Sequence, residues 1–179
     1  MIELNPKFHT IDFKNIDEKF TEMFNDFSPV NSNFSIENYF GEGLGLSTSL
    51  KTLLANSLIY EPEDFQGIYV FFKDNHPFYV GISRHVIKRI TQHVKGKNHF
   101  SSSLCYRLGA NLYEKEMGVA HSGGRAGLDF KKYCDPGKAA LIKCNVAFYK
   151  VEDFLELYLF EVYVAMKLGT LHYNLFVTH

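Results

Sequence analysis

The chain has 179 residues, of which 46% are hydrophobic, and its formal net charge at pH 7 is −1. This length fits one domain, or one small domain with an N-terminal extension, and the hydrophobic content suffices for a packed core. We find no uninterrupted apolar run of about 18 residues and no signal-peptide pattern after Met1, so we expect no membrane partner, no export and a cytoplasmic location.

The first third of the chain predicts helices joined by loops. Apolar residues recur at helical spacing over residues 15–27, which indicates an amphipathic helix. Residues 28–45 are rich in Ser, Asn, Gly and Pro and predict a loop, and a second short helix follows at about 47–58. We therefore expect residues 1–62 to form an acidic, mainly helical N-terminal extension.

A β-hairpin is predicted next, because two segments dense in aromatic and β-branched residues flank the turn 74–77. A turn of two or four residues would place Tyr69 and Tyr79 on opposite faces of the hairpin. A three-residue or bulged loop instead pairs Phe71 with Tyr79 and Tyr69 with Gly81, which brings both tyrosines to one face. We expect this second register.

Helices, an insertion and a third strand are expected after the hairpin. In chain order they are a helix over 84–94 capped by Ser83, a helix over 101–111, a loop-rich insertion at about 115–137, a strand over 138–149, and a helix over 153–168 closed by Gly169. Together these elements predict an α+β fold, with a small three-stranded antiparallel sheet flanked by helices, in a domain of residues 63–179.

Charge is distributed unevenly along the chain. Residues 1–66 carry four lysines against eleven acidic residues, whereas residues 67–145 carry 13 basic residues against five acidic ones. The basic block indicates that the middle of the chain faces a polyanion. An equally acceptable interpretation is that the two blocks neutralise each other within one fold.

The three cysteines, Cys105, Cys134 and Cys144, have no C-x-x-C spacing. This pattern argues against a thiolate metal cage, and we expect free thiols.

Three charged or titratable residues stand out in the predicted helices. Arg89 and His93 are four residues apart and therefore share one helix face. The last helix is apolar almost all round, which predicts that it is buried, yet it contains Glu161. An ionised carboxylate in apolar surroundings is costly unless it is paired, so we expect a metal ion or a cationic partner there.

These residues form an ordered set: Gly67-Ile68-Tyr69, Tyr79-Val80-Gly81, Arg89, His93, Glu161 and Asn174. The set resembles the GIY-YIG nuclease family over about residues 67–179. It departs from the family pattern where Val80 replaces the common Ile and in the insertion at 115–137. The resemblance implies a metal-dependent nuclease that hydrolyses phosphodiester bonds.

The resemblance also implies roles for the individual residues. Tyr69 would be the general base for water, and His93 would accept the phenolic proton. Tyr79 would hydrogen-bond water or phosphate, Arg89 would hold the scissile phosphate, and Glu161 would bind Mg²⁺ or Mn²⁺. A simpler interpretation treats the tyrosines as amphipathic strand residues and Arg89 and His93 as solvated helix residues.

Four further residues are assigned to substrate binding. Gly67 and Gly81 would let the substrate or a neighbouring strand approach closely. Asn174 would support the last loop or contact backbone, and His99 belongs to a histidine–serine segment similar to one in some family members.

Three hypotheses for function follow. The first is an endonuclease that cuts double-stranded DNA by a one-metal mechanism, with a homodimer left open. The second is a nuclease toxin or effector with an immunity partner. The third is a catalytically silent nucleic-acid-binding module that keeps the hairpin.

Overall fold

A computed structural model of the chain describes residues 13–98 and 100–174. Within these residues the strands form one antiparallel sheet in the order β1-β4-β2-β3. The strands are β1 (Phe34–Ser35), β2 (Gly67–Lys73), β3 (His76–Ser83) and β4 (Asn145–Lys150). The α+β class is confirmed. The expected strand count of three was wrong, because the two residues of β1 pair with β4 and add a fourth strand.

The helices of the described residues are distributed along the whole chain. They are η1 (Phe13–Asn15), α1 (Ile16–Phe27), α2 (Pro29–Ser32), α3 (Ile36–Phe40), α4 (Leu46–Ala55), α5 (Val86–Lys95), α6 (Ser103–Met117), η2 (Arg125–Gly127), the π-helix η3 (Phe130–Cys134), α7 (Asp135–Ile142) and α8 (Phe154–Leu168). None of them is both long and apolar enough to cross a bilayer.

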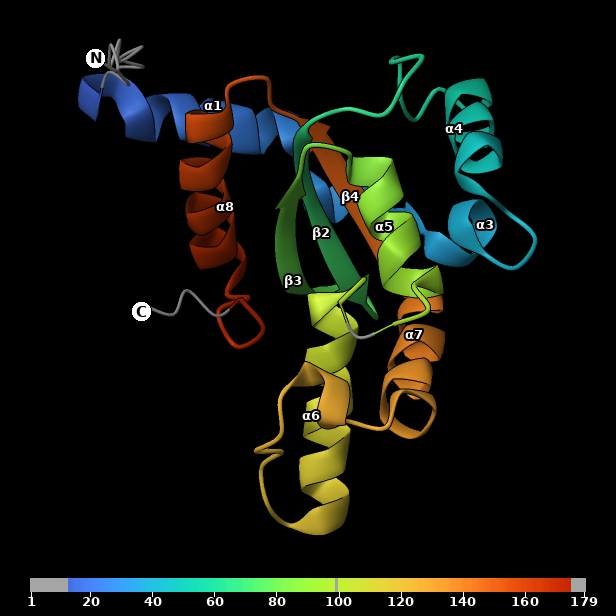
Figure 1. Cartoon of the computed structure of the whole chain (residues 1–179). Helices are drawn as coiled ribbons and strands as arrows, with labels where there is room; N and C mark the ends of the chain where they lie inside the picture. Colours follow the sequence, from blue (N-terminus) through green and yellow to red (C-terminus); the bar gives the residue numbers. More distant parts are fainter. Residues whose placement is uncertain (1–12, 99, 175–179) are drawn as a thin grey trace, which may run out of the picture.

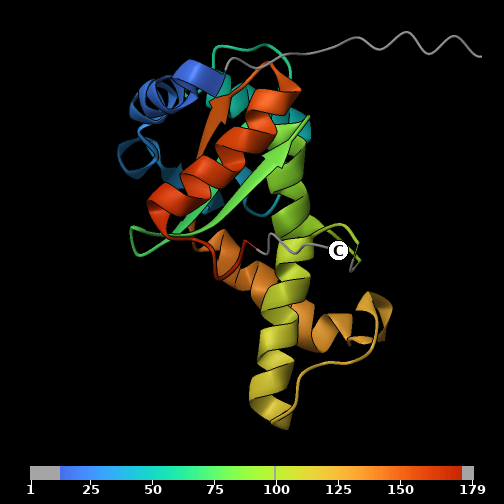
Figure 2. The ribbon, with the colours of Figure 1, turned by 90° about the vertical axis from the view of Figure 1, so that its left-hand side faces the viewer.

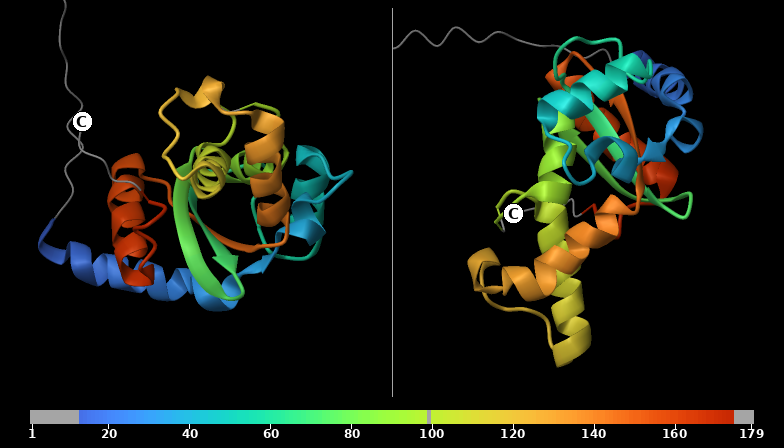
Figure 3. Two further views of the ribbon diagram at one scale, coloured as in Figure 1. Left: turned by 90° about the horizontal axis from the view of Figure 1, so that it is seen from below. Right: turned by 90° about the vertical axis from the view of Figure 1, so that its right-hand side faces the viewer.

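Helices cover both faces of the sheet (Figures 1 and 3). Successive side chains of β2 point to opposite faces, so its near-continuous apolar sequence serves two cores. Ile68 and Val70 pack towards α1 and α8, whereas Tyr69 and Phe71 face α5 and its neighbours. The sheet is therefore the middle layer of three.

The segment after α6 forms an arm that projects from the sheet (Figure 2). Its own small apolar cluster centres on Leu128, Tyr133 and Cys134, against α6. The expected loop-rich insertion at 115–137 is thus partly helical. The expected strand over 138–149 is correct only from Asn145, because Pro136 presets the first turn of α7 and the following residues continue that helix.

Two other expectations from the sequence were wrong. The segment expected as loop, 28–45, contains α2, β1 and α3, and Pro29 again starts a helical turn. The last helix is not buried all round: Leu157, Phe160 and Val164 face the sheet and α1, whereas other apolar side chains of α8 are exposed. One face suffices to pack the helix, so the opposite face meets solvent.

The three cysteines are free and buried, as expected.

The hairpin has the expected register. Phe71 pairs with Tyr79 and Tyr69 with Gly81, and the register shifts between Phe71 and Phe72. The turn itself has two residues, Asp74 and Asn75, both with left-handed φ. The shift makes Phe78 an extra residue of β3, which is a β-bulge.

The N-terminus of α5 is capped by a residue that precedes β2, at the open end of the hairpin. The Asp64 carboxylate accepts hydrogen bonds from the backbone N–H groups of Ile87 (2.8 Å) and Lys88 (2.9 Å). The expectation that Ser83 caps this helix was wrong, because the Ser83 hydroxyl instead accepts from the His85 N–H just outside it. A carboxylate also suits the positive end of the helix dipole.

We predict that Asp64→Ala lowers the free energy of unfolding by about 1–2 kcal/mol, because two helix N–H groups lose their acceptor. Urea unfolding followed by circular dichroism measures the change. Asp64→Asn should retain much of the stability, since its carbonyl oxygen can still accept. Glu63→Ala is the matched control because Glu63 is exposed. Equal stability of the Asp64→Ala and Glu63→Ala proteins would contradict the cap.

Candidate active site

Tyr69 and Tyr79 lie side by side on the sheet face that α5 covers. Their ring centroids are 6.2 Å apart, and the side chains are 1% and 8% exposed. Both hydroxyls therefore lie in a largely apolar layer, where a polar group needs a partner.

Tyr69 has such a partner in His93 of α5. The phenolic oxygen of Tyr69 and Nε2 of His93 are 2.7 Å apart and share a hydrogen bond. His93 is completely buried, and burial, with a smaller contribution from the Arg89 charge, holds the pKa of its imidazole well below the usual 6.5. The ring is therefore neutral at neutral pH.

The glycine opposite Tyr69 makes room for this arrangement. A Cβ on Gly81 would lie 2.5 Å from the phenolic oxygen of Tyr69. At Gly67 a Cβ would lie 2.2 Å from the backbone oxygen of Tyr149 in β4. Each glycine thus permits a close approach within the protein itself, by the Tyr69 ring at Gly81 and by a neighbouring strand at Gly67.

Arg89 lies on the same face of α5 as His93. Its guanidinium donates to the backbone oxygen of Ser101 (3.0 Å), with longer contacts of 3.4 Å to Gln92 and Ser103. These bonds fix the guanidinium beside the tyrosines.

Burial is the main influence on both tyrosines. It raises the pKa of Tyr69 well above 10, the neighbouring Tyr79 raises it further, and Arg89 lowers it. Burial likewise raises the pKa of Tyr79, Arg89 opposes this, and Glu161 adds to the rise. The Arg89 charge is therefore what favours ionisation at this site.

Glu161 approaches Tyr79 from α8, beyond the edge strand β3. Its half-buried position raises the pKa of its carboxyl to about 7, and the charge of Arg107 lowers it. Arg107 of α6 also donates to the backbone oxygen of Tyr173. Sequence reasoning missed Arg107, because nothing in its spacing distinguishes it from the other basic residues of the middle block.

The side chains here fit a divalent cation held by few protein ligands. No group of three or more His, Cys, Asp or Glu side chains that could hold a metal occurs in residues 13–98 and 100–174. Mg²⁺ keeps several waters and is often bound through one or two carboxylates together with substrate phosphate. The Glu161 carboxylate is a hard oxygen donor of this kind.

Asn174 clamps the edge of the sheet. Its amide oxygen accepts from the Val80 N–H (2.9 Å) and its amide nitrogen donates to the Val80 carbonyl (2.6 Å). It thereby pairs with edge-strand groups that have no neighbouring strand. Asn174 thus contacts the backbone of this chain's own edge strand, and its assignment to substrate binding stays a prediction. His99 lies outside the described residues.

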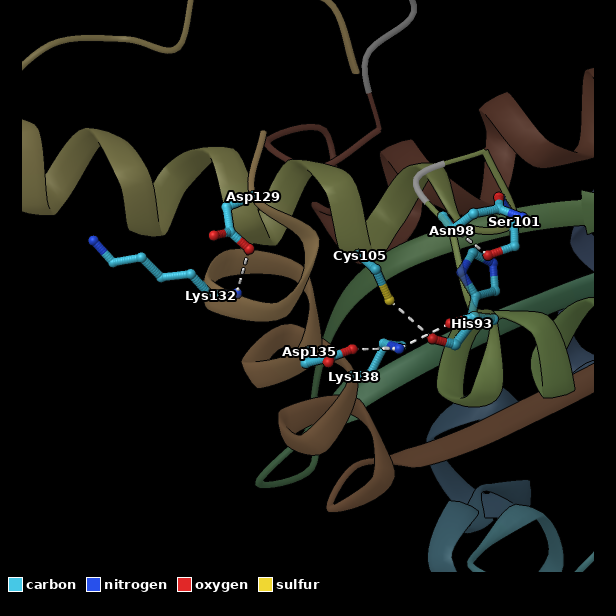
Figure 4. A network of polar contacts seen from close by, with 9 residues as sticks. His93, Asn98, Ser101, Cys105, Asp129, Lys132, Asp135 and Lys138 are labelled. Carbon is cyan, nitrogen blue, oxygen red and sulfur yellow. Dashed lines mark hydrogen bonds and ion pairs between the residues drawn. The ribbon is translucent and has the colours of Figure 1, made fainter. Parts of the chain in front are cut away.

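A second set of contacts fastens the C-terminal end of α5 (Figure 4). The Cys105 thiol of α6 donates to the backbone oxygen of His93 (2.8 Å). The Lys138 ammonium of α7 donates to the backbone oxygen of Gly96 (2.8 Å) and pairs with Asp135 (2.6 Å). His93 is thus held by its backbone as well as by its ring.

We predict that Gly81→Ala displaces the Tyr69 ring and lowers the free energy of unfolding by about 1–3 kcal/mol, because the added methyl overlaps the phenol. Chemical denaturation measures the loss. Gly45→Ala is the control, since a Cβ there meets nothing within 4 Å. If both variants are as stable as the original chain, the close approach of Tyr69 to Gly81 is refuted.

The raised pKa of Glu161 predicts a pH-dependent effect of Glu161→Gln. The folded chain holds this proton more tightly than the unfolded chain, so the carboxyl lowers stability progressively as pH rises from its usual value of 4.5 to about 7. The glutamine variant should match the original chain near pH 4 and exceed it by roughly 2–3 kcal/mol at pH 8. Urea unfolding in chelator measures this; a pH-independent difference would contradict it.

Comparison with known proteins agrees with this geometry. Residues 65–116 match the family model of the GIY-YIG catalytic domain. Tyr69, Tyr79, Arg89 and His93 lie inside the matched residues, whereas Glu161 lies outside them. Neither the curated proteins nor the solved structures that were searched contain a match. The family consists of endonucleases, and residues 65–116 of this chain are similar to its catalytic domain.

Proposed function

We propose that this protein is a metal-dependent endonuclease that hydrolyses DNA phosphodiester bonds, with Tyr69 as the general base of a one-metal mechanism. The observation that carries the proposal is the Tyr69–His93 hydrogen bond of 2.7 Å beside the Arg89 guanidinium. A buried phenol bonded to a neutral imidazole and exposed to a fixed positive charge is unusual in a core. It suits proton transfer rather than packing alone.

Tyr69 would act on the attacking water in its ionised form. Burial opposes ionisation and Arg89 favours it. A substrate phosphate that binds Arg89 would partly neutralise the guanidinium charge that favours ionisation of Tyr69. Tyr69 would therefore ionise most readily before the phosphate binds Arg89. We therefore expect cleavage to accelerate with rising pH.

Arg89 would hold the scissile phosphate, because a guanidinium stays charged and can donate two parallel hydrogen bonds to phosphate oxygens. Arg107 is a second candidate for this contact, since its charge reaches Tyr79 and Glu161. Two guanidinium groups flanking the tyrosines would stabilise the charge that develops on the phosphate.

Glu161 would hold Mg²⁺ or Mn²⁺ at the β3 edge of the site. When bound, the cation would supply positive charge to the leaving oxygen of the phosphodiester. Tyr79 lies between Glu161 and Tyr69 in this arrangement and would orient water or phosphate by hydrogen bonding. Asn174 would hold β3 through its hydrogen bonds to Val80. Gly81 would leave room for the Tyr69 ring, and Gly67 would allow β4 to approach closely.

The proposed substrate is double-stranded DNA and the proposed location is cytoplasmic. The basic block of residues 67–145 supports a polyanionic substrate. One ion pair, Lys143 with Glu37 (2.8 Å), joins this block to the acidic N-terminal block. We propose residues 63–179 as the catalytic domain and residues 1–62 as its extension, and sedimentation would establish whether the protein dimerises.

Plasmid cleavage with Mg²⁺ or Mn²⁺ tests the function. We predict that Tyr69→Phe, Arg89→Ala and Glu161→Ala each reduce the cleavage rate at least 100-fold, because each removes a group that acts on the reacting atoms. Glu156→Ala and Arg84→Ala are matched controls. Glu156 lies on the same helix as Glu161 and pairs with Lys19 of α1, and Arg84 is exposed just before α5.

Equal cutting by the original protein and by all three site variants would reveal a contaminant. No cutting with any divalent metal would favour the silent nucleic-acid-binding module. Parallel assays on single-stranded DNA and on structured RNA would show whether double-stranded DNA is the preferred substrate.

A further inference from the structure

Ser102 connects the N-terminus of α6 to the imidazole of His93. As the N-cap of α6, its hydroxyl oxygen accepts the backbone N–H of Cys105 at 3.0 Å. The same oxygen lies 2.7 Å from Nδ1 of His93. Ser102 is 2% exposed, so its hydroxyl must find its partners inside the protein.

The direction of the Ser102–His93 bond follows from counting hydrogens. A backbone N–H can only donate, so the Ser102 oxygen is an acceptor towards Cys105. Its own hydrogen then needs an acceptor. Two acceptors are available among the described residues, Nδ1 of His93 at 2.7 Å and the Cys105 sulfur, which also contacts the Ser102 hydroxyl, and the nitrogen is the stronger of the two. If Nδ1 carried a hydrogen instead, the buried hydroxyl hydrogen would have only the weakly accepting sulfur, which is unfavourable.

The neutral imidazole carries one hydrogen, so a bare Nδ1 requires that Nε2 carries it. Nε2 lies 2.7 Å from the Tyr69 oxygen, and it must therefore donate to that oxygen. The hydrogen of Tyr69 then points away from His93. The Tyr79 ring lies next to Tyr69, with ring centroids 6.2 Å apart.

We infer that Ser102 is a positioning residue that holds His93 as a hydrogen-bond donor to Tyr69, so that His93 stabilises the Tyr69 phenolate instead of accepting its proton. The catalytic part of this inference rests on the proposed function, whereas the order of the hydrogen bonds does not. It replaces the role expected for His93 from the sequence.

This order changes the route of the proton. The O–H bond of Tyr69 breaks on the side away from His93, the electron pair stays on the Tyr69 oxygen, and the proton passes to solvent water. The phenolate then accepts from Nε2–H of His93 while Arg89 supplies positive charge. The imidazole stays neutral throughout, in agreement with its complete burial.

The tautomer of His93 tests the order directly and needs no activity. Protein with ¹⁵N-labelled histidine, free of metal at pH 7, gives long-range ¹H–¹⁵N correlations that separate protonated from bare ring nitrogens. The His93 signals are assigned by their loss in His93→Gln. We expect hydrogen on Nε2, and hydrogen on Nδ1 would overturn the inference.

Variants of Ser102 test its consequence for catalysis. Ser102→Ala should weaken the preference for the Nε2 tautomer, reduce plasmid cleavage at pH 7 roughly tenfold or more, and move the rising limb of the pH–rate profile to higher pH. Ser102→Thr keeps a hydroxyl and should restore all three properties. Asp129→Ala removes the cap of η3, which accepts from the Lys132 N–H, and controls for cap loss alone.

An unchanged pH–rate profile in Ser102→Ala would overturn the positioning role. A shift of equal size in Asp129→Ala would overturn it as well, because cap loss would then explain the effect. If the original protein shows the Nε2 tautomer but cuts no nucleic acid, the hydrogen-bond order stands and the proposed nuclease function fails.

Discussion

The extra residue in β3 determines on which face of the sheet Tyr79 lies, and therefore whether the two tyrosines of the candidate site meet. Asp74 and Asn75 close a two-residue turn, and the pairing that leaves this turn would place Tyr79 opposite Val70 if it continued unchanged. Tyr79 would then face α8, on the other side of the sheet from Tyr69. Because Phe78 is inserted as a bulge, Tyr79 pairs with Phe71 and joins Tyr69.

Two further constraints act on the face that this register creates. Gly81 is the cross-strand partner of Tyr69, and its missing side chain leaves the volume that the phenol occupies. Asp64, three residues before β2 begins, fixes the first turn of α5. The same hairpin therefore supplies the phenols and orients the helix that carries their imidazole, which explains why residues close in sequence suffice for most of the arrangement.

The sequence predicted that Tyr69 meets Tyr79 and that Arg89 shares a helix face with His93, because local geometry decides both. Alternation along a strand and the i, i+4 spacing of Arg89 and His93 are properties of single elements. Neither depends on how the elements pack together. Ser102 and Arg107 could not be found in this way. Their roles arise from contacts of Ser102 with His93 of α5 and of Arg107 with Tyr173 after α8, and the spacing of residues along α6 does not predict these contacts.

The same limit explains the errors in the fold. The segments 28–45 and 115–137, expected as loop, each contain a proline at or near the start of a helix, because proline also favours the first helical turn and the surrounding residues decide between the two. The apolar α8 was expected to be buried on all sides, yet a helix needs only one apolar face to pack. The exposed remainder depends on which elements surround it, a property of the whole fold.

The polar groups of the candidate site differ in how far the protein compensates the cost of their burial. The side chains of Ser102, His93 and Tyr69 are buried, and hydrogen bonds join Ser102 to His93 and His93 to Tyr69. Their burial therefore costs little free energy and keeps each group neutral. Glu161 is half-buried, and the nearby charge of Arg107 does not prevent its pKa from rising to about 7. The folded protein thus compensates the burial of Tyr69 but not that of the Glu161 carboxylate. A cation at Glu161 would remove this penalty, so substrate and metal binding should stabilise the edge of β3, while the hydrogen-bonded tyrosine stays unchanged.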